Sequence, residues 1–459
     1  MTVMELIRRA ALLAPIVLLG ACTTTQIHER TLDNGLKIIV QENHRAPVVV
    51  SQVWYKVGAI DEPEGLTGIS HVLEHLMFKG TKTLKPGEFS RIIAAEGGRE
   101  NAFTGNDYTA YFQTLEKSRL PVSFRLEADR MQNLVFDESE FQKEAAVVRE
   151  ERRLRTEDNP EALTYEQFNA TAYTVHPYRH PIVGWMKDLE AHTLDDMKQW
   201  YSNWYAPNNA TLVVAGDVRP AEVFSLAEQY FGKLPVRKTA RRNIPAEPAQ
   251  TSARHSTVKA PAKVPYYITG YHVPVLGHGK DEDVYALSVL AGVLDGGNSA
   301  RLTRELVRGS QVAASAGAGF NGMARGPGMF MLDGTPASGK TVAELESALM
   351  QQVERLKQEM VSEDELKRIK AQVLASDIFG RDSVFYQAMR IGMMETIGLD
   401  YRTMDDYLDN IKKVTPEKMR EVAQKYLVVS NQTTTVLEPQ PMNTKSRRKP
   451  MPGGGHGRH

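Results

Sequence analysis

Hydrophobic and polar positions alternate in two segments near the N-terminus and then recur at helical spacing. The alternation over Thr31–Val40 and Pro47–Val57 predicts two strands with a turn at Glu42-Asn43. A turn at residues 65–68 then leads into a helix that Thr67 or Ser70 could cap and that Gly80 would end. The apolar face of this helix comes from Leu73, Leu76, Met77 and Phe78.

Further periodic segments continue as far as residue 231. The patterns predict helices at Pro86–Ala95, Val122–Leu134, Asp137–Arg155 and Arg219–Phe231, a strand pair in Asn101–Thr114, and a strand at Ala210–Ala215. Residues 237–262 are rich in Pro, Lys, Arg and small polar residues and lack periodicity, so they are typical of a linker.

The second part of the chain repeats this order of elements without obvious sequence identity. It predicts strands at Tyr266–Val273, Ala313–Phe320, Met329–Gly334 and Thr433–Leu437, and helices at Glu282–Leu294, Thr341–Met360 and Glu363–Ile378. The interpretation is an α+β protein of two similar halves, residues 26–236 and 263–439. Residues 440–459 form a basic, Gly- and Pro-rich tail that we expect to be disordered.

Composition narrows the possible functions. The chain has 459 residues, and its 56 basic residues balance its 56 acidic ones. This length suggests two to four domains with ample core, and the balanced charge gives no electrostatic reason to expect nucleic-acid binding.

The first 22 residues are typical of a bacterial lipoprotein signal peptide. Arg8-Arg9 precede an apolar run, and Leu19-Gly20-Ala21-Cys22 resembles a lipobox. Cys22 is the only cysteine, so no disulfide can form within the chain. We therefore expect lipidation at Cys22 and a periplasmic protein held at the outer membrane through that lipid alone. The alternative is an ordinary cleaved signal with an incidental cysteine.

The segment His71-Val72-Leu73-Glu74-His75 carries the clearest chemistry. On a helix, His71, Glu74 and His75 share one face. Two neutral imidazoles can hold a zinc ion while the carboxylate reaches a water molecule beside it. The alternative is that His71 and His75 are half-buried residues with satisfied hydrogen bonds and no metal-binding role.

A third ligand is predicted on the helix that Asp137 and Glu140 would open with a capping box. Glu144 and Glu151 lie on the same stripe of this helix as Phe141 and Val148, whereas Glu150 lies off it. Carboxylates in line with apolar residues favour a nearby cation, so we expect Glu151 to be the ligand and Glu144 to support the site. The alternative is a solvated helix with Glu–Arg pairs.

These residues resemble the pitrilysin family of zinc peptidases, which includes insulin-degrading enzyme and the mitochondrial processing peptidase. Glu151 follows His75 after 75 intervening residues, and Glu144 precedes Glu151 by seven positions, as in that family. Further matches are residues 32–36, 97–98, 101–104, 176–178 and 296–302, so the resemblance covers residues 26–439.

The resemblance implies two α/β-sandwich halves facing each other as a clamshell around a chamber. It also implies one Zn²⁺ held by His71, His75 and Glu151, and a general base, Glu74, that passes a proton from water to the leaving amine. Asn101 and Ala102 would lie on an edge strand that holds the substrate peptide by main-chain hydrogen bonds.

One family feature is absent. Active members carry an Arg and, seven residues later, a Tyr in the second half, where this chain has Val307 and Ala314. We therefore expect the zinc-bearing subunit of a two-subunit endopeptidase whose partner supplies that pair. The alternatives are a non-catalytic scaffold or peptide-binding subunit, and a peptidase that processes one specific precursor.

Overall fold

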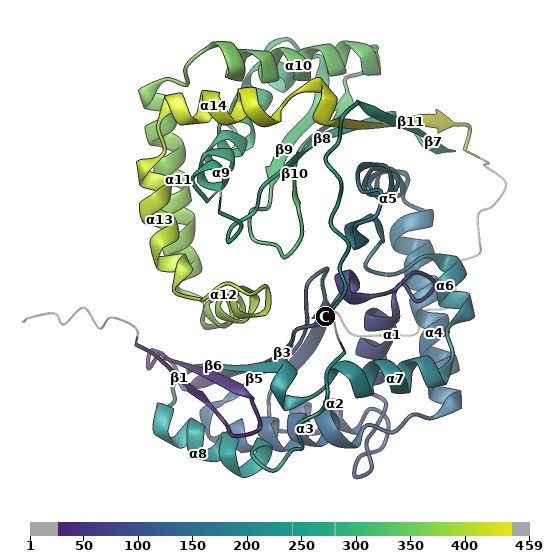
Figure 1. Cartoon of the computed structure of the whole chain (residues 1–459), viewed down its shortest axis with the longest axis vertical. Coiled ribbons are helices and arrows are strands. Elements are labelled where there is room, and N and C mark those ends of the chain that lie inside the picture. The colour runs from purple at the N-terminus through teal and green to yellow at the C-terminus, as the bar shows by residue number, and fades with distance from the viewer. Residues whose placement is uncertain (1–25, 241, 280, 443–459) are drawn as a thin grey trace, which may run out of the picture.

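The computed structural model describes residues 26–240, 242–279 and 281–442, which fold into two halves, each built of one sheet with helices packed on it (Figure 1). This confirms the α+β, two-half prediction. The predicted signal peptide, Cys22 and residues 443–459 lie outside the described residues. Among the helices of the described part, none has the length and apolar character needed to span a bilayer.

The first half, as described, contains a six-stranded sheet in the order β1-β2-β6-β3-β5-β4. Its strands are β1 (Ile27–Thr31), β2 (Lys37–Glu42), β3 (Val48–Tyr55), β4 (Arg99–Thr104), β5 (Thr109–Glu116) and β6 (Ala210–Gly216). Its helices are α1 (Ile69–Leu76), α2 (Glu88–Ala95), α3 (Leu120–Asn133), α4 (Glu138–Arg152), α5 (Pro160–Ala172), α6 (Met186–Ala191), α7 (Leu194–Trp204) and α8 (Pro220–Phe231).

The predicted strand Thr31–Val40 is in fact a hairpin. Strands β1 and β2 pair antiparallel, with Thr31 opposite Lys37. The chain reverses between them because Gly35 adopts φ +86°, a conformation that favours glycine, and because Asn34 binds the backbone of residues 231 and 234. The Asp33-Asn34-Gly35 sequence was the signal for this turn.

The second half contains a five-stranded sheet in the order β7-β11-β8-β10-β9, again among the described residues. Its strands are β7 (Arg254–Pro261), β8 (Tyr266–Val273), β9 (Ala313–Phe320), β10 (Gly328–Pro336) and β11 (Gln432–Gln440). Its helices are α9 (Asp281–Asp295), α10 (Val342–Gln358), α11 (Glu363–Gly380), α12 (Val384–Thr396), α13 (Thr403–Lys413) and α14 (Pro416–Tyr426).

The predicted linker 237–262 and the predicted tail 440–459 both extend too far into this half. Residues Arg254–Pro261 form β7, which pairs in parallel with β11, and β11 itself continues to Gln440. Side chains in β7 alternate between more and less exposed positions because an edge strand buries one face only. A prediction based on composition misses that alternation, because the strand contains Lys and Arg.

One helix of each half packs on the sheet of the other half (Figure 1). Helix α12, from the second half, packs on β3 and β6 of the first sheet, and α5, from the first half, packs on β7, β8 and β11 of the second. Each sheet is therefore covered on both faces, by its own helices on one side and by the exchanged helix on the other.

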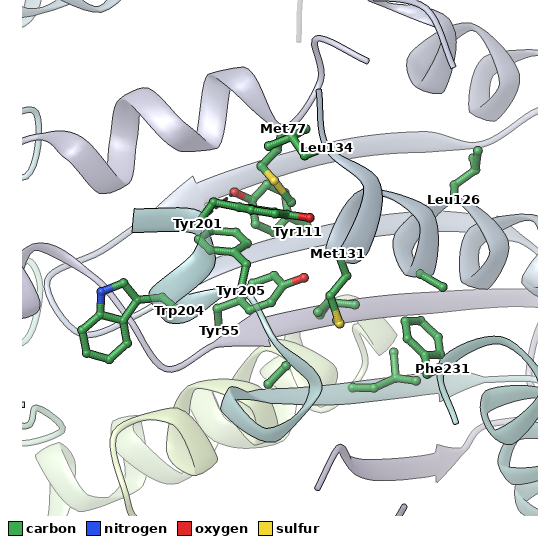
Figure 2. Packing of buried hydrophobic residues seen from close by; sticks show 14 of the residues in the cluster. Tyr55, Met77, Tyr111, Leu126, Met131, Leu134, Tyr201, Trp204, Tyr205 and Phe231 are labelled. Carbon is green, nitrogen blue, oxygen red and sulfur yellow. Dashed lines mark hydrogen bonds between the residues drawn. The ribbon is translucent and has the colours of Figure 1, made fainter. Parts of the chain in front are cut away.

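The core of the first half contains an aromatic cluster (Figure 2), and buried residues of α1 belong to the same core. Tyr55 and Tyr111 from adjacent strands meet Tyr205, and the hydroxyls of Tyr111 and Tyr205 lie 3.0 Å apart. These three side chains are fully buried, so the paired hydroxyls satisfy each other where water is absent. The cluster gives α1 a rigid support.

The loop between β9 and β10 joins the two halves at a buried polar cluster. Arg325 binds Asp61 with both terminal nitrogens, at 2.9 and 3.1 Å. Tyr178 donates to Asp107 at 2.7 Å and accepts the backbone N–H of Gly326 at 2.9 Å. The His176-Pro177-Tyr178 sequence thus lies where the halves meet.

Candidate active site

Helix α1 presents three polar side chains to a pocket while its other face is buried. His71, Glu74 and His75 line the pocket. Val72 and Leu73 are fully buried in the core. The expected spacing of residues i, i+3 and i+4 therefore places all three chemical groups on one side of the helix.

The start of α1 differs from the expectation. Its N-cap is Gly68 at φ +85°, and neither Thr67 nor Ser70 caps it. Instead the carboxylate of Glu62 accepts the backbone N–H groups of Gly68 and Ser70, at 2.7 and 2.9 Å. The Thr67 hydroxyl donates to Asp188 at 2.6 Å. A carboxylate from an earlier segment thus satisfies free N–H groups of the helix N-terminus.

Helix α4 brings the carboxylates as its periodicity predicts. Asp137 accepts the backbone N–H of Glu140 at 3.0 Å, although no reciprocal bond completes a capping box. Glu144 and Glu151 line the pocket. Glu150 points elsewhere and pairs with Arg153 at 3.2 Å on the surface.

His71, His75 and Glu151 form a group that could hold a metal ion. One ligand atom from each residue lies within 4.8 Å of the others, and His71 Nε2 is 3.7 Å from Glu151 Oε2. In the described part of the chain, His71 Nδ1 and Glu151 Oε2 are buried without a hydrogen-bond partner. Two nitrogens and one carboxylate, with room for water, fit a zinc ion of the catalytic type.

A hydrogen-bonded chain orients His75. Its Nδ1 lies 3.1 Å from Glu144 Oε2, and Lys79 Nζ lies 2.8 Å from Glu144 Oε1. If Nδ1 carries the proton and donates it to the carboxylate, Nε2 keeps its lone pair for a metal. Burial alone would raise the pKa of Glu144, but the hydrogen bonds from His75 and Lys79 outweigh burial and lower it.

Burial keeps the other imidazole neutral. It lowers the pKa of His71 to about 3, and the charges of His75 and Arg155 add to this effect. A histidine whose pKa lies this far below 7 has a free lone pair at neutral pH. His71 is therefore in the form that metals bind.

Glu74 is tied to the edge strand of the first sheet. Thr104, the last residue of β4, donates its hydroxyl to Glu74 Oε2 at 2.6 Å. Burial raises the pKa of Glu74, and the hydrogen bond from Thr104 partly offsets that rise. A carboxylate with a raised pKa is better suited to accept a proton and give it up again.

Strand β4 lies at the edge of its sheet and borders the same pocket. Asn101 is exposed, and its side-chain oxygen accepts the N–H of Ala102 at 2.9 Å. Ala102 is a small side chain beside the metal ligands. An extended peptide could add to this open edge by main-chain hydrogen bonds, as predicted for Asn101 and Ala102.

The two residues that replace the Arg/Tyr pair lie in the second half. Val307 belongs to the π-helical segment Leu302–Gly309 and packs against the second core. Ala314 is exposed on β9, at the edge of the second sheet. Neither side chain can donate a hydrogen bond to a substrate.

Four residues of this site had no predicted role of their own. Thr104 and Lys79 bind Glu74 and Glu144, Glu62 holds the start of α1, and Arg155 borders the pocket. Lys79 stands four residues after His75, which was a usable helical signal. Glu62 lies in a loop, where no periodicity could have shown its role.

Comparison with known proteins identifies the family. The model of the insulinase family, peptidase family M16, matches residues 37–184, and the model described as the peptidase M16 inactive domain matches residues 191–373. The zinc protease PqqE of Helicobacter pylori is 33% identical over 92% of this chain and 96% of its own length. This chain belongs to peptidase family M16. The resemblance to the pitrilysin family is thereby confirmed.

Solved protease structures have the same fold. A protease from Helicobacter pylori has a TM-score of 0.86 and 32% sequence identity, and the match covers 90% of this chain and all of that one. The periplasmic protease PqqL from Escherichia coli has a TM-score of 0.75 and 17% identity, and the match covers 94% of this chain but 52% of PqqL. PqqL shows a likeness of fold alone.

Proposed function

We propose that this M16 protein is a zinc-dependent endopeptidase that cleaves extended peptides or unfolded small proteins held in the chamber between its halves. The proposal rests on one observation: three candidate metal ligands and Glu74 lie together beside the open edge strand β4. Relatives named zinc proteases agree with it.

In this proposal the residues divide the work. His71, His75 and Glu151 hold Zn²⁺, which when bound would polarise the peptide carbonyl and promote the ionisation of water. The edge of β4 aligns the peptide. Glu74, steadied by Thr104, accepts the proton of the attacking water and passes it to the leaving amine. Glu144 and Lys79 keep His75 in the metal-binding orientation.

The proposed working form includes a related partner subunit. Neither Val307 nor Ala314 can stabilise the negative charge that develops on the carbonyl oxygen, a role that needs a hydrogen-bond donor. The match to about half of full-length PqqL is consistent with assemblies of two such units. We propose that a second subunit supplies the missing Arg and Tyr.

The test uses a quenched fluorescent peptide and the purified chain, alone and with a related subunit encoded nearby. We expect one zinc per chain, cleavage with the partner only, and no cleavage by Glu74→Gln with zinc retained. Glu151→Gln should lose zinc. Glu150→Gln is the matched control, because Glu150 lies one residue away and points to the surface.

Other outcomes have clear meanings. Full activity of the chain alone would contradict the two-subunit proposal but keep the peptidase. Bound zinc without cleavage in either form would favour the non-catalytic scaffold. A single precursor cleaved in preference to all other peptides would favour the processing peptidase.

The proposed location is the periplasm, with a lipid on Cys22 as the anchor. Labelling with a radioactive fatty acid should mark the wild-type chain in cells and should not mark Cys22→Ala. Equal labelling of both would contradict the anchor.

A further inference from the structure

A second cation borders the metal site. Arg155 lies in the π-helical turn Arg153–Glu157, which directly follows α4, and it lines the same pocket as Glu74 and Glu151. Its side chain is 73% exposed. The guanidinium therefore stands at the mouth of the pocket, beside the groups that we propose act on the peptide.

Arg155 is free to bind a ligand. In the described part of the chain its guanidinium makes one ion pair, 3.5 Å from Glu151 Oε2, and donates no hydrogen bond. That same oxygen belongs to the metal-ligand candidate, so a bound metal would compete for it. Lys79, the other cation lining the pocket, is held by Glu144 at 2.8 Å.

The chemistry of the group indicates its ligand. A guanidinium offers paired N–H donors that match a carboxylate in a bidentate arrangement. Arg155 shares the pocket with residues 101–104 of β4, the edge along which the peptide is proposed to lie. A carboxylate of a peptide on that edge can meet this guanidinium outside the metal site.

We propose that Arg155 recognises a carboxylate of the bound peptide, so that the pocket prefers substrates with an acidic side chain or a free C-terminus close to the cleaved bond. The inference rests on the proposed peptidase function and names its substrate class. Arg155 would be a specificity-determining residue, because the contact adds to binding without taking part in bond cleavage.

The test measures peptide binding rather than cleavage. Zinc-loaded Glu74→Gln protein is titrated with labelled neutral octapeptides, in which a single Glu is moved through every position of a C-terminally amidated chain. A neutral octapeptide with a free C-terminal carboxylate forms the second arm. We expect one Glu position, or the free C-terminus, to tighten binding about fivefold to tenfold. The arm that responds identifies the source of the carboxylate.

The same titration is repeated with Arg155→Gln, Arg155→Lys and Arg153→Gln in that background. Arg155→Gln should abolish the preference and leave binding of the neutral peptide unchanged, and Arg155→Lys should keep part of it. Arg153 is the matched control, since it lies two residues away and pairs with Glu150 outside the pocket. Zinc content and melting temperature should be equal across the set.

Several results would overturn the inference. They are a preference that survives Arg155→Gln, an equal loss for neutral and acidic peptides, and no measurable binding of any peptide. Failure of the proposed function is recognised separately: wild-type protein would then cleave nothing, with or without a partner, even if the Glu74→Gln protein binds acidic peptides through Arg155.

Discussion

The carboxylate of Glu144 holds two cationic or proton-bearing groups at once. It lies 3.1 Å from His75 Nδ1 and 2.8 Å from Lys79 Nζ. Without Lys79 the buried carboxylate would have His75 as its one remaining partner in the described part of the chain, which is costly. The lysine therefore stabilises the ionised form that orients His75.

We expect Glu144→Gln to weaken zinc binding about 10- to 100-fold, because the amide no longer enforces the tautomer and orientation of His75. Competition with a chromogenic chelator measures the affinity. Glu140→Gln is the control, since Glu140 lies on the same helix but pairs with Lys143 at the surface. Unchanged zinc affinity of Glu144→Gln would contradict the role given to Glu144.

Residues on regular helices were the predictable part of this site. Glu144 and Glu151 follow the 3.6-residue period of α4, so the sequence could separate them from Glu150. Thr104 could not be found this way, because its bond to Glu74 joins a strand to a helix 30 residues earlier in the chain. Such contacts depend on the packing of the sheet and not on local spacing.

At the scale of elements, many strands and helices that bury one face were predicted, but α7 and α14, which also bury one face, were missed. Elements held by distant contacts were missed as well. Residues 237–262 were expected to be a linker, yet Glu247 fixes this segment firmly. Its carboxylate accepts the backbone N–H groups of residues 174, 175 and 176 at 2.8, 3.0 and 3.0 Å. A composition rich in Pro and Arg gives no hint of such an anchor.

The anchor predicts a pH-dependent stability. Burial alone would raise the pKa of Glu247, but the three backbone hydrogen bonds outweigh burial and lower it from 4.5 to about 2. The ionised form therefore stabilises the fold above about pH 4.5, and this contribution disappears as the pH falls toward 2. Glu247→Gln should lower the free energy of unfolding at pH 7 by about 2 kcal/mol.

Urea unfolding of both proteins at several pH values measures the difference. We expect the difference in free energy of unfolding between wild type and Glu247→Gln to become smaller as the pH falls below 4.5. Glu438→Gln serves as the control, because Glu438 is exposed and, among the residues that the structure describes, its carboxylate pairs with Lys259 alone, at 3.6 Å. A gap that stays constant with pH would exclude the carboxylate as its cause.

At the scale of the whole molecule, each exchanged helix meets the opposite sheet at a glycine. A Cβ on Gly392 of α12 would lie 2.1 Å from Trp54 Nε1, and a Cβ on Gly270 of β8 would lie 2.6 Å from Phe168 of α5. Both contacts join residues far apart in the sequence. The sequence therefore showed two halves but not that each one completes the other.

Gly392→Ala should destabilise the protein by about 1–3 kcal/mol, because the added methyl overlaps Trp54 and forces α12 away from β3. In an exposed helix, the same substitution would stabilise the protein. A decrease in stability would therefore support the overlap with Trp54. Thermal or urea unfolding provides the measurement. In a Trp54→Ala background, which lacks the whole ring, the added methyl should cost much less; equal losses in both backgrounds would contradict the overlap.

The exchange of α5 and α12 also constrains the order in which the two sheets can complete their folding. When residues 26–236 have left the ribosome, α12 has not yet been synthesised, so the face of the first sheet that carries Ile39, Trp54 and Val213 is still uncovered. Helix α12 comes late in the chain, and α13, α14 and β11 follow it. An apolar face left open during synthesis is a target for chaperones and for aggregation. Completion of the first sheet is therefore a late event, and nascent chains that stop before residue 396 should depend on holding factors that the finished protein does not need.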